Sequence, residues 1–415
     1  MFRERRIVTL AKGSIEKRGE NTWRLTVELG TLPDGTRDRE RKTITVEDKT
    51  LLRTTKKLRE HLEDELAKFK QEVLCGNYIK PEKTTFQQFV DKHWKPKYAS
   101  DPENLAESTL VIYEQHLQTH ILPKFGGKRL DNIETMHVVD FMAYLKTPEA
   151  RKDGKSGVLG NGTQRFILRV LRNVLNRAKE WRFISFNPCD GIKWPKKPES
   201  KIKVFDEFEI AAIIDALNQQ PTIWRLMILG TFLGGLRRGE LVALEINDCN
   251  FGDSSIMIDE NIPIKIKGEP LIKAPKTNSS VRRIKMPKWY MDELEAYMKE
   301  WEKQRRAAGA KWRCPEGRQF LFHKGDGVPY HPNTPTNWWR QFLQKNGFRH
   351  VKLHGLRHTS ATFLLEQGVT TKAVAERLGH SDERTLTTTY SHVTKTMEER
   401  AAAEFDRFDR RPPSI

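Results

Sequence analysis

The chain has 415 residues, more than one hydrophobic core usually supports, so we expect about two to four domains. Its 73 Lys and Arg against 55 Asp and Glu give a formal charge of +18, which favours a polyanionic partner such as nucleic acid, although charge alone also fits a merely basic protein. No stretch approaches the ~18 consecutive apolar residues of a membrane span, and no apolar signal segment follows the charged first residues, so we expect a cytoplasmic protein without a membrane partner.

Residues 1–75 predict a small domain in which a helix covers a three-stranded antiparallel sheet. The segments GSIEKRG, TWRLTVELG and RERKTITV alternate apolar and polar residues and are separated by polar turns. From Asp48 to about Leu74 the spacing of the leucines changes to that of an amphipathic helix. We therefore expect a separate N-terminal domain.

A second, helical domain is predicted for residues 84–186, after a short linker (CGNYIKPEK) with Gly and Pro. Helical patterns cover residues 86–99, 107–121, 134–147 and 163–180. On the last of these helices, Arg165, Arg169 and Arg172 line up apart from the apolar face. Such a row can bind a phosphate backbone, although it also fits an ordinary solvated helix face.

A basic interdomain linker is expected at residues 187–203. Three prolines accompany a cluster of lysines there, among them Lys193, Lys196 and Lys197, which a folded core would not readily bury. The segment either runs along DNA or is an extended solvated tether.

The remaining residues predict a larger domain at 204–404 and a disordered tail at 405–415. The domain reads as mainly helical, with a strand-rich insert near 255–286. The fold class expected for the whole chain is therefore multidomain and mainly α with small β-sheets, ending in a mixed α/β domain.

The segment GGLRRGEL places two glycines before a run of charged residues. Glycines allow a tight backbone turn that can project one side chain inward, and Arg237 is the candidate. Glu240 can orient it through a charge-assisted hydrogen bond. Taken alone, the motif also fits a surface turn between helices.

Further on, PKTNSSVRRIKMP places Lys276 at the expected tip of a hairpin between two strands. Its ammonium can donate a proton to a leaving oxygen, but a lone loop lysine is usually solvated and inert.

The segment VKLHGLRHTSAT predicts a helix that carries His354 and Arg357 on one face, a suitable pair for two phosphate oxygens. The i, i+4 spacing of His354 and His358 also occurs in zinc sites. No metal is expected, because the Glu that follows the first His in zinc hydrolases is missing and the four cysteines form no CxxC pair.

The segment LGHSDERTLTTTYSH carries the last candidates. Gly379 is expected to end a helix, His380 follows it, and Tyr390 comes after a Ser/Thr-rich stretch. These polar neighbours are unlike the apolar stripe in which a buried structural tyrosine usually lies.

Together these four segments, in this order, resemble the tyrosine recombinase (phage-type integrase) family. The resemblance implies that six residues fill the active-site positions and that Glu240 supports the first arginine: Arg237, Lys276, His354, Arg357, His380 and Tyr390. The sequence departs from the family pattern at Gly234-Gly235, where Thr-Gly is common, and in the long interval between His380 and Tyr390. Less specifically, the N-terminal sheet resembles arm-site DNA-binding domains of phage and conjugative-transposon integrases, and residues 84–186 resemble the family's core-binding domain.

The resemblance implies strand cleavage by the Tyr390 hydroxyl, with a 3′-phosphotyrosyl intermediate and without a cofactor. The two arginines and His354 would neutralise the phosphate, while Lys276 would protonate the leaving 5′ oxygen. Expected partners are double-stranded DNA at core and arm-type sites, a homotetramer on DNA, and, left open, an accessory DNA-bending or excision factor. The alternatives are relaxation of DNA like a type IB topoisomerase and a DNA-binding regulator without catalysis.

Overall fold

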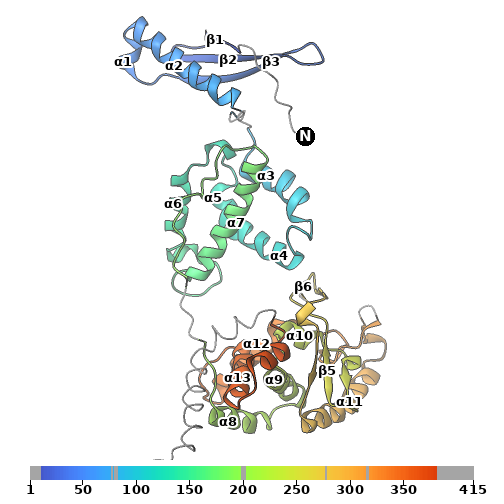
Figure 1. Cartoon of the computed structure of the whole chain (residues 1–415). Coiled ribbons are helices and arrows are strands. Elements are labelled where there is room, and N and C mark those ends of the chain that lie inside the picture. The colour runs from blue at the N-terminus through green and yellow to red at the C-terminus, as the bar shows by residue number, and fades with distance from the viewer. Residues whose placement is uncertain are drawn as a thin grey trace, which may run out of the picture. The chain divides into compact units, whose positions relative to one another are not determined.

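The computed structural model describes residues 11–75, 78, 83–197, 202–275, 278–314 and 317–380. Internal contacts divide the chain into two compact units, residues 1–199 and 200–415. The first unit contains a small sheet with a helix and a separate helical domain, each with its own hydrophobic core (Figure 1). The expected fold class, multidomain and mainly helical with small sheets, is confirmed.

The N-terminal sheet is antiparallel with the order β1-β2-β3, and one of its faces is covered by α2. Its elements are β1 (Lys12–Lys17), β2 (Thr22–Thr31), β3 (Arg37–Thr45), α1 (Lys49–Leu52) and α2 (Thr55–Leu74). Alternation along β2 turns Leu25 and Val27 inward, where they pack with Phe69 of α2. The opposite face of the sheet is left polar.

The helical domain is organised around α7, whose apolar face is fully buried. Its elements are α3 (Phe86–Phe89), η1 (Val90–Ala99), α4 (Glu107–His116), η2 (Leu117–Ile121), α5 (Leu122–Phe125), η3 (Leu130–Asn132), α6 (Thr135–Tyr144), η4 (Pro148–Ala150) and α7 (Asn161–Glu180). A capping box between Thr85 and Gln88 starts the domain. Each of the four helical patterns read from the sequence corresponds to helix in the structure, in two cases with π-helical turns (η1 and η2).

The first half of the expected linker belongs to the helical domain. Asn187 and Cys189 are buried, while Ile192 and Trp194 pack against the helical core. The prolines and lysines of this segment predicted an extended chain, but the apolar residues between them are enough to anchor it. Lys193, Lys196 and Lys197 remain exposed, as a basic surface segment requires.

The C-terminal unit packs helices and a small sheet around one large core, within which α9 is buried. Its helices are α8 (Glu207–Leu217), α9 (Thr222–Gly234), α10 (Arg238–Ala243), η5 (Ile246–Asp248), η6 (Asn278–Ser280), α11 (Lys288–Ala308), η7 (Gly309–Lys311), α12 (Asn333–Lys345), α13 (Leu353–Glu366) and α14 (Thr371–Leu378). Its strands are β4 (Cys249–Asn250), β5 (Ser255–Ile258), β6 (Lys265–Ile266), β7 (Glu269–Pro270) and β8 (Arg282–Lys285).

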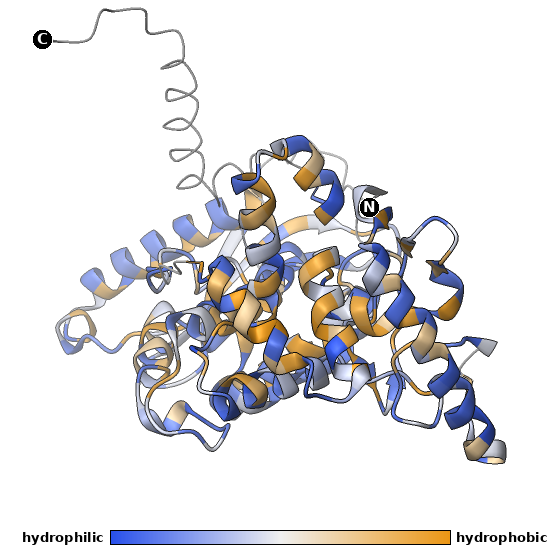
Figure 2. Cartoon of the chain, turned by 90° about the horizontal axis from the view of Figure 1, so that it is seen from below, coloured by the Kyte–Doolittle hydropathy of each residue, from blue (hydrophilic) through white to orange (hydrophobic). Residues whose placement is uncertain are grey.

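Two antiparallel sheets make up the predicted strand-rich insert: the larger has the order β4-β5-β8, and the smaller pairs β6 with β7. Ile256 of β5 and Ile284 of β8 are paired on adjacent strands of the larger sheet and are both buried. Many helices carry apolar residues along one side and polar residues along the other (Figure 2). Among the described helices, none combines the length and the apolar character that crossing a bilayer requires.

Candidate active site

A glycine turn after α9 delivers Arg237 to the surface of the C-terminal unit. Gly235 has the left-handed conformation (φ 61°), and a Cβ at this position would lie 2.3 Å from Cδ2 of Leu378. Both facts require glycine, because other residues pay for positive φ with strain and would collide here. Gly235 is the glycine that the usual Thr-Gly shares. At Gly234, where this chain departs from that pattern, a Cβ would lie 3.3 Å from Cγ of Leu236.

The Glu240 carboxylate binds both the backbone amide and the guanidinium of Arg237. Oε2 of Glu240 accepts a hydrogen bond from the Arg237 amide at 2.9 Å, and Oε1 accepts one from Nη1 at 2.5 Å. Glu240 is 3% exposed, whereas the Arg237 side chain keeps 35% of its surface. The carboxylate is therefore a buried support, and the guanidinium is the accessible partner, as the sequence pattern predicted.

A second arginine, which the sequence reading did not single out, also binds Glu240. Arg282 at the start of β8 donates from Nη2 to Oε2 at 3.0 Å and from Nη1 to Oε1 at 3.3 Å. Its Nε donates to the Arg377 carbonyl at 2.7 Å. The sequence signal was the strand pattern of VRRIKMP, in which Arg282 is two residues from Ile284 and therefore shares its face, and the structure shows that face to be buried.

Helix α13 begins at Leu353 and carries both His354 and Arg357, as predicted. The Arg357 guanidinium is buried, with the residue 2% exposed, and donates to the carbonyls of Gly235 and Leu378. Its expected contact with a phosphate oxygen stays a prediction. In this structure Arg357 ties together the turn before Arg237 and the end of α14.

The ring of His354 packs edge to face against that of His358, with 4.9 Å between the ring centroids. Within the described parts of the chain, no three His, Cys, Asp or Glu side chains gather into a group that could hold a metal ion.

Helix α14 ends where the sequence predicted, at Gly379, which has the left-handed conformation (φ 64°). The Gly379 carbonyl accepts a hydrogen bond from Nη2 of Arg237 at 2.9 Å. The next residue, His380, donates its amide to the Ala375 carbonyl at 3.0 Å, and its buried Nδ1 has no hydrogen-bond partner among the described residues. The end of α14 thus brings His380 beside Arg237.

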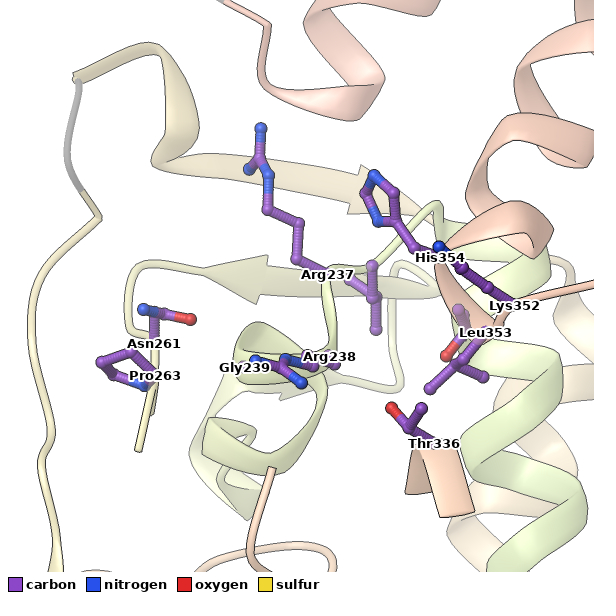
Figure 3. Close-up of a pocket in the computed structure, with 11 residues that line it drawn as sticks. Arg237, Arg238, Gly239, Asn261, Pro263, Thr336, Lys352, Leu353 and His354 are labelled. Carbon is purple, nitrogen blue, oxygen red and sulfur yellow. The ribbon is translucent and has the colours of Figure 1, made fainter. Parts of the chain in front are cut away.

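Arg237 and His354 line one pocket of about 460 Å³. Figure 3 shows their side chains projecting toward the same side from separate elements, with Arg238 and Lys352 among the other lining residues. The stretches around Arg237 and His354 thus share one pocket. A third stretch joins them at Gly379, whose carbonyl accepts a hydrogen bond from Arg237, so three distant parts of the sequence form one cationic surface.

The protein environment keeps both histidines of the site neutral near pH 7. Although His354 retains solvent-exposed surface, the protein atoms around its ring, and then the charges of His358, Arg357 and Arg237, lower its pKa to about 4. Burial, followed by the positive charges of Arg357 and Arg237, also lowers the pKa of His380 to about 4. A neutral imidazole can accept a proton, as a general base must.

These shifts predict that the C-terminal unit loses stability in mild acid. An unfolded histidine has a pKa of about 6.5, so between about pH 4 and 6.5 the unfolded chain binds more protons and the unfolding free energy falls as the pH falls. We expect a lower urea midpoint at about pH 5 than at about pH 7.5, and a smaller difference in the double variant His354→Gln/His380→Gln. Equal pH dependence in the wild type and the double variant would contradict this assignment.

Two predicted site residues, Lys276 and Tyr390, lie outside the described residues. The other candidates belong to the helical domain. Arg165 donates to the Pro195 carbonyl at 2.5 Å, and Arg172 forms an ion pair of 3.0 Å with Asp190. Arg169 is exposed. Two members of the arginine row therefore anchor the segment after the helix, and their contact with DNA stays a prediction.

Comparison with known proteins gives matches to two family models. The phage integrase family matches residues 203–397, and the phage integrase N-terminal SAM-like domain matches residues 85–146. A tyrosine recombinase XerC-like protein of Caldanaerobacter subterraneus subsp. tengcongensis is 27% identical over 301 residues, which cover 69% of this chain and 74% of the relative. The ICEBs1 integrase of Bacillus subtilis is 23% identical over 293 residues, which cover 70% of this chain and 75% of that integrase.

Solved structures share the fold. The Tn1549 transposon integrase, in complex with circular intermediate DNA, superposes with a TM-score of 0.59 at 20% identity and covers 79% of this chain and 100% of that chain. A lambda integrase dimer bound to a core site gives a TM-score of 0.54 at 13% identity, and the match covers 93% of this chain and 96% of that chain.

Proposed function

Because the chain belongs to the phage integrase family, we propose that it is a site-specific tyrosine recombinase that cuts and rejoins double-stranded DNA. The observation that carries the proposal is the convergence of Arg237, His354 and His380 on one cationic surface. Integrases and tyrosine recombinases are the relatives found in sequence, and the matching integrase structures contain DNA. The enzyme class follows from this family.

The proposed chemistry starts from the charge of the phosphodiester. Attack on phosphorus adds negative charge to the nonbridging oxygens, so fixed positive donors must already be in place. Arg237 is such a donor, since Glu240 and the Gly379 carbonyl fix its guanidinium while part of it stays accessible. Preorganisation of this kind avoids the cost of reorienting water or side chains during the reaction.

Tyr390 is the proposed nucleophile. Its phenol has a reference pKa of about 10, so it needs a base or a strongly cationic site at neutral pH. His354, neutral in this environment, takes the phenolic proton as the oxygen bonds to phosphorus. The bond to the 5′ oxygen breaks, Lys276 protonates that oxygen, and a 3′-phosphotyrosyl linkage remains. His380 binds the scissile phosphate or positions the nucleophile.

Covalent trapping tests the function. A nicked suicide substrate loses a short 5′-hydroxyl fragment after cleavage, so rejoining is blocked and the adduct accumulates. We expect a labelled protein–DNA adduct that survives SDS, and peptide mapping should place the nucleotide on Tyr390. A protein that shifts the DNA in a native gel without any adduct would instead be the non-catalytic regulator.

Lys276→Ala should slow cleavage of ordinary DNA by about 10²- to 10⁴-fold, because the alkoxide then leaves without a proton. A substrate with sulfur at the 5′-bridging position should be cleaved almost as fast by the variant as by the wild type, since a thiolate needs no acid. Single-turnover cleavage rates on the two substrates provide the measurement. Equal impairment on both would remove Lys276 from the acid role.

The polar face of the N-terminal sheet is the proposed reader of arm-type DNA sites. Antiparallel register places Arg24 beside Thr43 and Thr26 beside Arg41, on the face opposite the apolar core. Lys12 of β1 lies on the same face. A polar strand surface with several cations suits the DNA backbone and the edges of bases in the major groove.

The domain boundaries complete the proposal: residues 1–75 bind arm sites, 84–186 bind the core site and 204–404 catalyse. Assembly of a homotetramer on DNA distinguishes recombination from relaxation by a monomeric topoisomerase. An excision or bending factor would act on the assembly of this tetramer. Counting subunits on paired sites by native mass spectrometry tests the assembly.

A further inference from the structure

Arg282 is a buried cation that contacts the groups supporting Arg237. It is 8% exposed, and its guanidinium binds both carboxylate oxygens of Glu240, which in turn bind Arg237. Its Nε donates to the Arg377 carbonyl, and Nη1 donates to the Ser280 carbonyl at 3.0 Å. A buried guanidinium is costly unless paired in this way.

The charges explain why two arginines share one carboxylate. If Arg237 were the sole partner of Glu240, a buried carboxylate would cancel the charge that Arg237 must offer to a phosphate. With Arg282 present, the trio has a net charge of +1, and the exposed member is Arg237. Burial raises the pKa of the Glu240 carboxyl, but Arg282 first and Arg237 second outweigh this and hold the pKa below its usual value.

Arg282 also reaches the second support of Arg237, the end of α14. Its Nε holds the Arg377 carbonyl, two residues before Gly379, whose own carbonyl binds Arg237. A Cβ on Gly379 would lie 3.0 Å from Nη1 of Arg282, so the chain turns directly against this guanidinium. Both acceptors that orient Arg237 are therefore packed on the same side chain.

We propose that Arg282 is a positioning residue for strand cleavage: it neutralises Glu240 and fixes the end of α14, so that Arg237 keeps its charge and direction for the scissile phosphate. This inference rests on the proposed recombinase function. Arg282 has no direct contact with DNA in this scheme and acts through Arg237.

Three variants of the full chain test it. Arg282→Met removes the buried charge, and Arg283→Met removes the neighbouring, outward-facing charge of the same strand as a matched control. The double variant Arg282→Met/Glu240→Gln removes both members of the buried pair. Single-turnover cleavage is measured on a suicide substrate with an ordinary scissile phosphate and on one with an uncharged methylphosphonate at that position.

We expect Arg282→Met to cleave the ordinary substrate about 10²-fold more slowly than the wild type, and Arg283→Met to match the wild type. On methylphosphonate the loss should shrink, because less positive charge is needed. The double variant should cleave about tenfold faster than Arg282→Met, because the uncharged amide that replaces the Glu240 carboxylate no longer cancels the positive charge of Arg237. A purely structural role would impair both substrates equally and would make the double variant no better.

Several results overturn the proposal: normal cleavage by Arg282→Met, equal losses on the two substrates, or a double variant no faster than the single one. If Arg282→Met does not fold, the double variant decides, because a folded double variant that cleaves supports the proposal and one that cannot cleave overturns it. Failure of the proposed function looks different, since the wild type and Arg283→Met would then also form no adduct.

Discussion

Replacing Tyr390 by Phe abolishes the covalent protein–DNA adduct and leaves DNA binding nearly unchanged. The substitution removes one oxygen, the proposed nucleophile, and keeps the ring. Affinity for DNA comes mainly from phosphate contacts made by Lys and Arg, none of which is altered. The measurement is an SDS gel of the labelled suicide substrate together with a native gel-shift titration of the same preparation.

The matched control is Tyr330→Phe, another phenol of the C-terminal unit. Tyr330 is half-buried, and its ring is tilted against that of Trp224 with 5.2 Å between the centroids, so loss of its hydroxyl should leave adduct formation intact. An adduct formed by the Tyr390 variant at the wild-type rate would reject the nucleophile assignment. Loss of the adduct in both variants would show that the substitutions act through folding.

Two of the three other tyrosines of this unit are too deeply buried to act as the nucleophile. Tyr290 is fully buried and donates its hydroxyl to the Leu226 carbonyl at 3.0 Å. Tyr297 is also buried. Burial raises the pKa of both phenols, which opposes formation of the phenolate needed for attack. Neither side chain can approach a DNA strand without unpacking the core.

Local chemistry made part of the site predictable from sequence. Glycine directly before charged residues indicated the turn that presents Arg237, and the spacing to Glu240 indicated its partner. Gly379 was expected to end a helix and does so. These features depend on residues within a few positions of each other, whose relative geometry the backbone fixes.

The features that sequence reasoning missed depend on contacts across the fold. Arg282 meets Glu240 only because β8 packs beside the turn after α9, and Arg357 is buried because Gly235 and Leu378 offer it carbonyls. Similarly, Trp194 anchors a segment whose prolines and lysines resemble a free linker. Local patterns show that a side chain is charged, but they do not show which distant groups surround it.

The buried pair also makes Glu240 a determinant of stability. Glu240→Ala would leave the Arg282 guanidinium without its carboxylate at a site that is 8% exposed. Removal of one partner of a buried ion pair typically costs about 3–5 kcal/mol, because the remaining charge stays desolvated. We expect the urea midpoint of the C-terminal unit to fall accordingly, and cleavage to be lost because Arg237 has no orienting acid.

Asp292→Ala provides the control for this effect. Asp292 pairs with Lys288 at 2.7 Å on α11, but both side chains are largely exposed, so water screens the pair. Such surface pairs contribute about 0–1 kcal/mol, and cleavage should be normal. A Glu240 variant as stable as the Asp292 variant would mean that water reaches Arg282. In that case the buried carboxylate would not be what holds β8, the turn after α9 and the end of α14 together around Arg237.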